Sequence, residues 1–379
     1  MGRQKKQFSV FSFELNTENS KLFEGMNLIE LTRALIDISS VTGDEAAVAH
    51  FLCAHLESLG YHVEMQEVEP GRANLLATHG AKLTALFFST HLDTVPPHIA
   101  SSEDAEFIYG RGACDAKGII AAQITAAEQL RAEGVDGVGL LFVVDEELGS
   151  LGARAANHHP LAESCRHLIN GEPTDNRLGV GSKGTLRVTI KTEGRAAHSA
   201  YPEAGVSAIE TLLDVLSDVR AKQWPVDDFF GETTCNIGTL SGGTRPNVIP
   251  AAAQAELLFR LVTEAEIVKQ ILEETIAGRA HIDYVSTTPP VRMLAVEGFA
   301  QTIVRFTTDI PHLRAWGSPV LLGPGSILDA HTAHERITKR ELHTAVDLYT
   351  RLARTLLARD LADDAVAIDR TYVEEGVRA

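Results

Sequence analysis

Acidic and imidazole side chains follow three apolar stretches of the sequence at the point where each stretch ends. ALFFST leads into His91 and Asp93, LLFVVD leads into Glu146 and Glu147, and HLING leads into Glu172. Ligand sites in open α/β sheets gather at the carboxyl ends of the strands. Side chains of these types, brought together at one sheet edge, would form a metal site of nitrogen and oxygen ligands.

A fourth acidic residue, Asp115, lies in the glycine-rich segment GRGACDAKG and adds to this set. Each residue also has a simpler interpretation. A lone histidine such as His91 is more often hydrogen-bonded than metal-bound, and Asp93 is either a turn former or a carboxylate that orients a metal-bound imidazole. Glu146 and Glu147 would suit a helix N-terminus, but adjacent acids after an apolar strand repel each other unless a cation or a proton intervenes.

Two glycine-rich segments raise the alternative of a phosphate-binding loop. GRGACD has a GxG pattern without the third glycine of a dinucleotide site, and GVGSKG at 179–184 lacks the spacing of a P-loop. We therefore interpret neither as a nucleotide site.

The elements that would position these residues alternate between apolar strands and helices. The pattern predicts strands at 83–90, 138–144 and 166–170, and helices at 27–38, 44–59, 115–133, 150–157 and 339–358. The second helix is expected to be capped near Thr42 or Asp44. Continuous apolar strands separated by helices predict an α/β domain with a doubly wound, mostly parallel sheet.

The pattern changes near Lys183, where TLRVTIKTEG alternates with a period of two. A helix at 205–221 and the strand-like segments CNIGTL and AAQAELLFRLV follow. We therefore expect a smaller α+β domain at 183–290, inserted into a catalytic domain formed by 26–182 and 291–379. Residues 1–25 are expected to be an N-terminal extension.

Composition excludes several classes of protein. The chain has 379 residues, 44% of them apolar, and a net charge of −17, which argues against nucleic-acid wrapping and against an anionic membrane surface. No apolar run reaches the roughly 18 residues of a membrane span, and the N-terminus does not resemble a signal peptide. Four scattered cysteines without a CxxC pair fit a reducing cytosol, so we expect a cytoplasmic protein.

Five motifs in order, STHLDTVP, YGRGACDAKG, DEELGS, NGEPT and GPGSILDAHTAHE, resemble the co-catalytic zinc aminoacylase and carboxypeptidase family. That family includes acetylornithine deacetylase, succinyl-diaminopimelate desuccinylase, aminoacylase and glutamate carboxypeptidases. The resemblance covers about residues 27–360. It implies a zinc-binding α/β domain that is interrupted by a smaller dimerisation or lid domain.

The resemblance also implies a role for each motif residue. Glu146 would be the general base, Asp93 would be the partner of the His91 ring, and two Zn²⁺ ions per subunit, replaceable by Co²⁺ or Mn²⁺, would be held by His91, Asp115, Glu147, Glu172 and His331. Two divalent ions about 3.5–4 Å apart can bind one hydroxide and polarise a substrate carbonyl. Their positive charge would offset the clustered carboxylates, and Glu146 would move the proton to the leaving amine.

The inserted segment carries a second set of candidates. By resemblance, His198 in GRAAHSAYP reaches across a homodimer and stabilises the oxyanion, while Arg260 binds the substrate carboxylate through its planar fork. Arg245 and Asn247 in GGTRPNVIP are further substrate-binding candidates. The alternatives are that His198 caps or packs and that Arg260 forms a structural ion pair.

Gly323, in GPGS, is expected to let the substrate approach the backbone closely. In the same motif the family often has a proline after the histidine, whereas this chain reads AHTAHE. His334 therefore adds an imidazole near the site, either as an accidental surface residue or as an influence on the metal.

The motifs predict a metal-dependent amidohydrolase that removes a small acyl group from an N-acyl amino acid, closest to the acetylornithine deacetylase branch and thus to arginine biosynthesis. An exopeptidase acting on a dipeptide is the alternative within the class. A non-catalytic relative that binds an amino acid or a metal is disfavoured, because every motif position holds a chemically competent residue. A homodimer is implied by resemblance alone.

Overall fold

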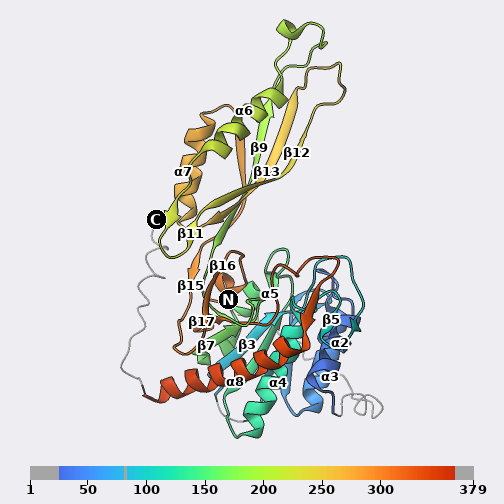
Figure 1. The fold of residues 1–379 in the computed structure, drawn as a ribbon, viewed down its shortest axis with the longest axis vertical. Coiled ribbons are helices and arrows are strands. Elements are labelled where there is room, and N and C mark those ends of the chain that lie inside the picture. The colour runs from blue at the N-terminus through green and yellow to red at the C-terminus, as the bar shows by residue number, and fades with distance from the viewer. Residues whose placement is uncertain (1–24, 81–82, 363–379) are drawn as a thin grey trace, which may run out of the picture. The chain divides into compact units, whose positions relative to one another are not determined.

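The computed structural model describes residues 25–80 and 83–362. All of the expected N-terminal extension except Gly25, and the last part of the expected catalytic domain, lie outside these residues. The described chain separates into two units, a large unit formed by 25–178 and 312–362 and an inserted unit, Gly179–Pro311 (Figure 1).

The large unit is built on one sheet. Its strands lie in the order β1-β2-β6-β3-β7-β17 and comprise β1 (His62–Glu69), β2 (Arg72–Thr78), β6 (Val138–Val143), β3 (Leu86–His91), β7 (His167–Asn170) and β17 (Ser318–Leu321). The four strands from β6 to β17 are parallel, and the hairpin of β1 and β2 adds antiparallel pairs at one edge. All residues of β3, β6 and β7 are buried, as expected for strands covered on both faces.

Successive aromatic residues of β3 show that both faces of this sheet are covered. The Phe87 ring meets Trp316 edge-on at 4.8 Å between centroids, whereas Phe88 meets Tyr349 at 5.4 Å. Because neighbouring strand residues point to opposite faces, these contacts belong to two separate apolar layers. The sheet is therefore doubly wound, as the sequence predicted.

Among the described residues, the large unit has five α-helices: α2 (Leu28–Asp37), α3 (Ala46–Ser58), α4 (Lys117–Ala132), α5 (Leu151–Ala156) and α8 (Lys339–Ala362). The helix α4 packs on β3 and β6, and α2 and α8 pack against α4. The first helix begins with a capping box in which Asn27 and Glu30 bond each other's backbone N–H groups. The predicted cap of α3 near Thr42 or Asp44 is wrong, because Glu45 is its N-cap residue and makes no side-chain capping bond.

The remaining elements of the large unit are short. They are β4 (Ser102–Glu103), β5 (Phe107–Tyr109) and β18 (Arg336–Thr338), which form a three-stranded sheet, and the 3₁₀ turn η1 (Pro160–Ser164). The 3₁₀ turn η3 (Ile310–His312) spans the boundary between the units.

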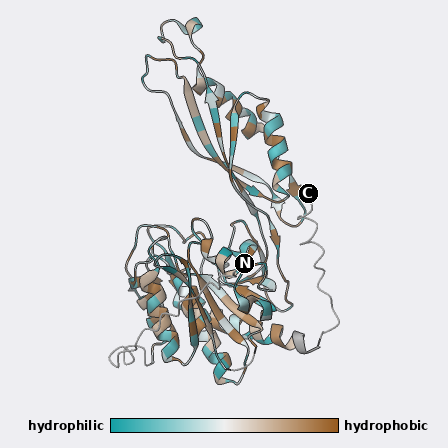
Figure 2. Ribbon diagram, turned by 180° about the vertical axis from the view of Figure 1, so that it is seen from behind, coloured by the Kyte–Doolittle hydropathy of each residue, from teal (hydrophilic) through white to brown (hydrophobic). Residues whose placement is uncertain are grey.

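The inserted unit is an α+β sandwich. Its antiparallel sheet has the order β12-β13-β9-β14 and is covered by two helices; these elements are β12 (Thr234–Gly242), β13 (Ala252–Leu261), β9 (Gly184–Glu193), β14 (His281–Thr288), α6 (Ala208–Ala221) and α7 (Ala265–Ile276). Buried and exposed residues alternate along β9 and β13, and Figure 2 shows this as alternating colours along the strands. The helix α7 and the strand β14 extend the predicted strand–helix–strand–strand pattern.

The boundaries of the inserted unit differ from the sequence prediction of 183–290. The unit starts at Gly179 and continues to Pro311, because β15 (Val291–Arg292) and β16 (Gln301–Val304) both pair with β8 (Leu178–Ser182). Pro289 and Pro290, at the end of the predicted segment, directly precede β15. The unit also holds the short pair of β10 (Val226–Asp227) and β11 (Gly231–Glu232) and the turn η2 (Pro202–Ala204).

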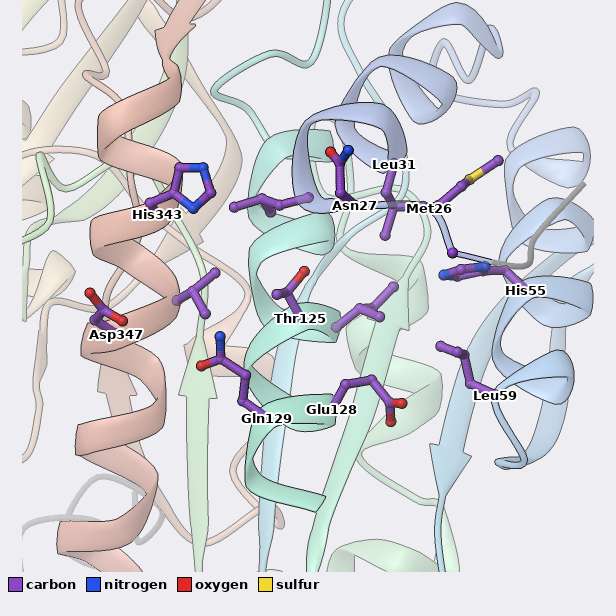
Figure 3. A pocket seen from close by; sticks show the side chains of 14 residues that line it. Met26, Asn27, Leu31, His55, Leu59, Thr125, Glu128, Gln129, His343 and Asp347 are labelled. Atoms are coloured by element: carbon purple, nitrogen blue, oxygen red, sulfur yellow. The ribbon is translucent and has the colours of Figure 1, made fainter. Parts of the chain in front are cut away.

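The large unit also contains a pocket of about 510 Å³ between helices α2, α3, α4 and α8 (Figure 3). Met26, His55, Glu128 and His343 are among its lining residues, and none of the residues predicted to do chemistry lines it. This pocket therefore does not belong to the predicted site. No described helix is both long and apolar enough to cross a membrane.

Candidate metal centre

The predicted ligands of the large unit lie at the carboxyl ends of neighbouring parallel strands. His91 is the last residue of β3, Glu147 follows β6, and Glu172 follows β7. His331 lies in the segment that joins β17 to β18, and Asp115 directly precedes Ala116, the N-cap residue of α4. These strands are adjacent in the sheet, so the topology brings the segments that follow them to one edge.

Asp115 is shared by two groups of potential ligands. The first group is His91, Asp115 and Glu172, the second is Asp115, Glu147 and His331, and the ligand atoms of each group lie within 4.8 Å of one another. One carboxylate oxygen of Asp115 lies 2.9 Å from His91 Nε2 and the other lies 3.3 Å from His331 Nε2. Each oxygen thus faces a different histidine, as a carboxylate between two cations would.

The two groups differ in their exposure to solvent. His91, Asp115 and Glu172 are all buried, whereas 47% of the His331 side chain is exposed. His331 Nε2 also lies 2.9 Å from Glu147 Oε1, and the Glu147 side chain is only 8% exposed. The second group is therefore open to solvent at His331.

The histidines and carboxylates of this cluster contact each other. Hydrogen bonds with Asp115 and Glu147 raise the pKa of His331 to about 10. Burial alone would raise the pKa of Asp115, but hydrogen bonds with His331 and His91 outweigh it and hold that pKa well below its usual range. A metal ion would replace the protons of both imidazoles.

The chemistry of this donor set fits a divalent metal. Imidazole nitrogen and carboxylate oxygen are ligands of zinc and of similar ions, and each group offers one histidine and two carboxylates. Three protein ligands per ion would leave a position for water or substrate, as in catalytic sites. Glu146, the predicted base, is half-buried and directly precedes Glu147.

Asp93 contacts His91 through its main chain and the Glu146–Glu147 segment through its side chain. Its main-chain carbonyl lies 2.9 Å from His91 Nδ1, whereas its carboxylate accepts the N–H groups of Glu146 at 3.1 Å and Glu147 at 3.2 Å. Thr42 Oγ1 also donates to this carboxylate at 2.8 Å. Burial alone would raise the pKa of Asp93, but the neighbouring His91 ring and these hydrogen bonds lower it. Its carboxylate therefore remains ionised as an acceptor.

A buried ion pair that the sequence did not predict supports the segment before Glu146. Asp145 has a left-handed backbone with a φ of 71°, a conformation that is costly for a residue other than glycine. Arg72 donates a hydrogen bond of 2.9 Å to the Asp145 carboxylate. It donates two further hydrogen bonds, of 2.6 and 2.8 Å, to the Glu45 carboxylate. The second Asp145 oxygen accepts the Leu151 N–H at 3.3 Å, so the turn is held from two sides.

Glu335 is a further buried residue that was not predicted from the sequence. It closes the AHTAHE motif, is buried, and forms an ion pair with the buried Arg111. The signal that could have identified it is its place in the same motif as His331.

Gly323 permits a close approach, but to the protein's own backbone. A Cβ atom at Gly323 would lie 2.3 Å from the carbonyl oxygen of Glu172. The Gly323 N–H also donates to Thr174 Oγ1 at 3.0 Å. The glycine therefore lets the segment after β17 pass directly beside the segment that carries Glu172.

Four predicted residues belong to the inserted unit and are not part of the cluster in the large unit. Three of them adjoin each other: the Ser199 N–H donates to the Asn247 carbonyl, the Val248 N–H donates to the Arg245 carbonyl, and His198 forms an isolated bridge with Val248. The side chains of His198, Arg245 and Asn247 are exposed. The two exposed loops thus present three polar side chains together.

Arg260, the fourth residue, lies on β13 between Thr234 and Thr185 of the neighbouring strands. Burial lowers the pKa of its guanidinium. Within the described part of the chain, no hydrogen bond or ion pair involves its side chain, so the structural ion pair considered above is not formed. His334, in contrast, is exposed, and among the described contacts only its backbone N–H takes part, donating to Thr332 Oγ1.

Two family models match the chain. The model described as a peptidase dimerisation domain matches residues 180–281, which lie in the inserted unit. The model of peptidase family M28 matches residues 74–215.

Curated relatives match nearly the full length. The chain is 36% identical over 351 residues to a peptidase M20 domain-containing protein of Schizosaccharomyces pombe, covering 90% of this chain and 88% of the relative. It is 37% identical over 378 residues to a probable carboxypeptidase of Aspergillus clavatus, covering 88% and 84%.

Solved structures share the fold. A tripeptidase from Staphylococcus aureus superposes with a TM-score of 0.73 at 23% identity, covering 86% of this chain and 98% of that one. A dinuclear metal-binding peptidase of the M20 family from Bacillus subtilis gives a TM-score of 0.65 at 17% identity, covering 90% and 99%. At these identities the likeness concerns the architecture alone.

Proposed function

We propose that this chain, which belongs to the M20 family of metallopeptidases, is a metal-dependent exopeptidase that releases the C-terminal amino acid of a small peptide. The observation that carries the proposal is the presence of Asp115 in both ligand groups, the second of which contains Glu147, the residue after Glu146. The relatives named as probable carboxypeptidases support the choice of reaction.

We assign one metal ion to each ligand group, with Asp115 common to both, and zinc as the native ion. Cobalt or manganese would be expected to replace it, because the donors are nitrogen and oxygen. When bound, the ions polarise the carbonyl of the scissile amide and lower the pKa of water.

Glu146 and Asp93 have different roles in the proposed reaction. Glu146 accepts the proton of the attacking water and passes it to the nitrogen of the leaving amino acid. Asp93 accepts hydrogen bonds from the backbone N–H groups of Glu146 and Glu147. These bonds fix the position of the base, Glu146, relative to the metal ligand, Glu147. Such fixed placement contributes to catalysis by removing the cost of orientation during the reaction.

The inserted unit supplies substrate recognition in this proposal. Arg260 has no competing partner among the described residues, so its guanidinium is available for the carboxylate of the amino acid to be released. His198, with Asn247 and Arg245 beside it, would stabilise the oxyanion in the partner subunit of a homodimer. The match to a peptidase dimerisation domain supports such a dimer.

Deacylation of an N-acyl amino acid is the second candidate reaction. It breaks the same kind of bond, an amide to the nitrogen of an amino acid with a free carboxylate. The segments AHSAYPEAGVSAIE and GPGSILDAH favour it, because they resemble the acetylornithine deacetylase branch. For either reaction we propose a cytoplasmic location, which the four free cysteines support.

The proposal is tested with protein from which a chelator has removed the metal. Hydrolysis of a small panel of substrates is measured before and after addition of Zn²⁺ or Co²⁺. The panel contains N-blocked dipeptides with a free C-terminal carboxylate, their C-terminal amides, acetylornithine, acetylcitrulline and succinyl-diaminopimelate. We expect metal-dependent cleavage of the free-acid dipeptides and not of their amides.

If only an N-acyl amino acid is cleaved and no dipeptide, the exopeptidase reaction is rejected in favour of deacylation. The absence of any turnover from protein that binds two metal ions would overturn both reactions. E146Q is the control, since it should retain metal and lose turnover.

A further inference from the structure

We infer that Glu335 is a positioning residue of the metal centre. Its carboxylate holds the turn that carries Asp115, so that Asp115 can serve both ligand groups. The inference rests on the proposed metal site, but not on the identity of the substrate.

One oxygen of Glu335 collects three backbone N–H groups from this turn. Its Oε1 accepts from Gly112 at 3.0 Å, from Cys114 at 3.2 Å and from Asp115 itself at 3.2 Å. The Glu335 side chain is fully buried. In a buried setting, hydrogen bonds to an ionised acceptor are about twice as strong as neutral ones, so this single oxygen fixes the course of the backbone up to Asp115.

The other oxygen of Glu335 pairs with Arg111 of the same turn. Arg111 is 2% exposed, and its Nε also donates to the Pro97 carbonyl at 3.3 Å. The guanidinium balances the buried carboxylate, which would otherwise be costly to keep ionised away from water. Glu335 therefore binds the turn that carries Asp115 both through the Arg111 side chain and through backbone N–H groups.

Glu335 also links the Asp115 turn to the segment that carries His331. The Gly110 N–H donates to the main-chain carbonyl of Glu335 at 3.0 Å. His331 lies in the same motif, and its Nε2 approaches Asp115 Oδ2 at 3.3 Å. Movement of Glu335 would therefore change the position of Asp115 relative to His331. Because Asp115 also contacts His91, its distance from that ring would change as well.

This arrangement also explains the glycine-rich segment GRGACDAKG. Backbone N–H groups that converge on one point form an anion-binding nest, which other proteins use for phosphate. Here the anion is the protein's own Glu335. Gly112 has a φ of +89°, and a Cβ there would lie 2.8 Å from Lys117 Cδ, so the turn requires glycine without any nucleotide.

Two variants test the role of Glu335. E335Q removes the negative charge at nearly constant shape, and E335D keeps the charge that Arg111 needs but withdraws the oxygens by one methylene. The affinities for Co²⁺ and Zn²⁺ are measured by chelator competition in the absence of substrate, together with the absorption spectrum of the Co²⁺ protein. We expect affinity to fall about 10- to 100-fold in each variant and the Co²⁺ spectrum to change.

L130A is the matched control for a purely structural effect. Leu130 is fully buried near the C-terminal end of α4, whereas Asp115 precedes the N-terminal end of that helix. We expect L130A to lower the melting temperature and to retain wild-type metal affinity and spectrum.

The inference is overturned if E335Q or E335D binds both ions with wild-type affinity and spectrum, whatever its stability. If E335Q does not fold, E335D alone decides between the two outcomes. Because no substrate is used, an incorrect assignment of the reaction would leave the affinity ratios unaffected and would appear only in the turnover assay.

Discussion

The carboxylate of Asp93 lies nearer to the backbone of Glu146 than to the ring of His91. The Glu146 N–H donates to Asp93 Oδ1 at 3.1 Å, whereas His91 Nδ1 is 3.6 Å from the same oxygen. The His91 ring is instead held by the main-chain carbonyl of Asp93. The side chain of Asp93 therefore supports the Glu146–Glu147 segment more directly than it supports His91.

Removal of this carboxylate should act unequally on the two metal ions. In D93A the main-chain partner of His91 remains, but Glu146 and Glu147 lose their anchor. We expect the ion of the Glu147 group to bind about 10- to 100-fold more weakly, with the ion of the His91 group retained, as measured by metal titration. T42V, which removes only one donor to Asp93, should have a smaller effect. Preferential loss of the His91 ion would contradict the geometry.

The order of the two adjacent glutamates can be tested by their amides. E146Q should lower kcat by about 10²- to 10⁴-fold, the usual contribution of a general base, with two ions still bound. E147Q should instead weaken the binding of one ion. Metal analysis alongside turnover separates the two, and an exchange of these phenotypes would reverse the assignment.

The ion pair of Arg72 with Glu45 and Asp145 should contribute strongly to stability. The Glu45 side chain is fully buried and that of Arg72 is 12% exposed. R72M would leave buried carboxylates without a cation, so we expect the free energy of unfolding to fall by about 3–5 kcal/mol in urea denaturation. R131M breaks a more exposed pair with Glu128 and should cost about 0–1 kcal/mol. Equal losses in the two variants would refute this difference.

His312 should make the protein less stable in mild acid. Burial, together with the positive charges of Arg154 and Arg314, lowers the pKa of His312 from 6.5 to about 4. Between these values the unfolded chain binds the proton more readily than the folded one, so the free energy of unfolding decreases as the pH falls from 6.5 to 4. H312Q should flatten this part of the profile of melting temperature against pH. H158Q, which replaces an exposed histidine that contacts the main-chain carbonyl of Arg154, is the control for the loss of a histidine from this region.

Removal of metal should destabilise the large unit. The cluster contains several carboxylates in a buried setting, and a bound cation adds stability through mass action, about 2.7 kcal/mol per ion at 100 times its Kd. We expect a chelator to lower the melting temperature and added Zn²⁺ to restore it. An unchanged melting temperature, in protein shown to have lost its metal, would argue against these residues as ligands.

The sequence indicated the doubly wound sheet and the residues at its strand ends because both follow local patterns. Apolar runs such as the one before His91 predict buried strands, and polar residues after them fall at one edge of a parallel sheet. The hairpin of β1 and β2 was not predicted, since β1 is mostly half-exposed and lacks an apolar run.

Contacts between distant segments could not be predicted in this way. Glu335 meets Gly112, and Arg72 meets Asp145, only after the chain has folded. The local pattern around Arg72 does not distinguish it from a solvated surface residue. The motif of His331 singles out Glu335 but does not show that its partner is the Asp115 turn. The end of the inserted unit at Pro311 was missed for a similar reason, because it depends on the pairing of β15 and β16 with β8.

The interruption of the large unit also orders the appearance of its ligands during synthesis. His91, Asp115 and Glu172 all precede the inserted unit, whereas His331 and Glu335 follow it. A nascent chain therefore holds every side chain of the first ligand group before the inserted unit has left the ribosome. The second group, the Glu335 clamp and helix α8 wait for the last part of the chain. The side chains of the first ligand group are therefore all synthesised before the inserted unit, but the turn that carries Asp115 is fixed only after Glu335 has been synthesised.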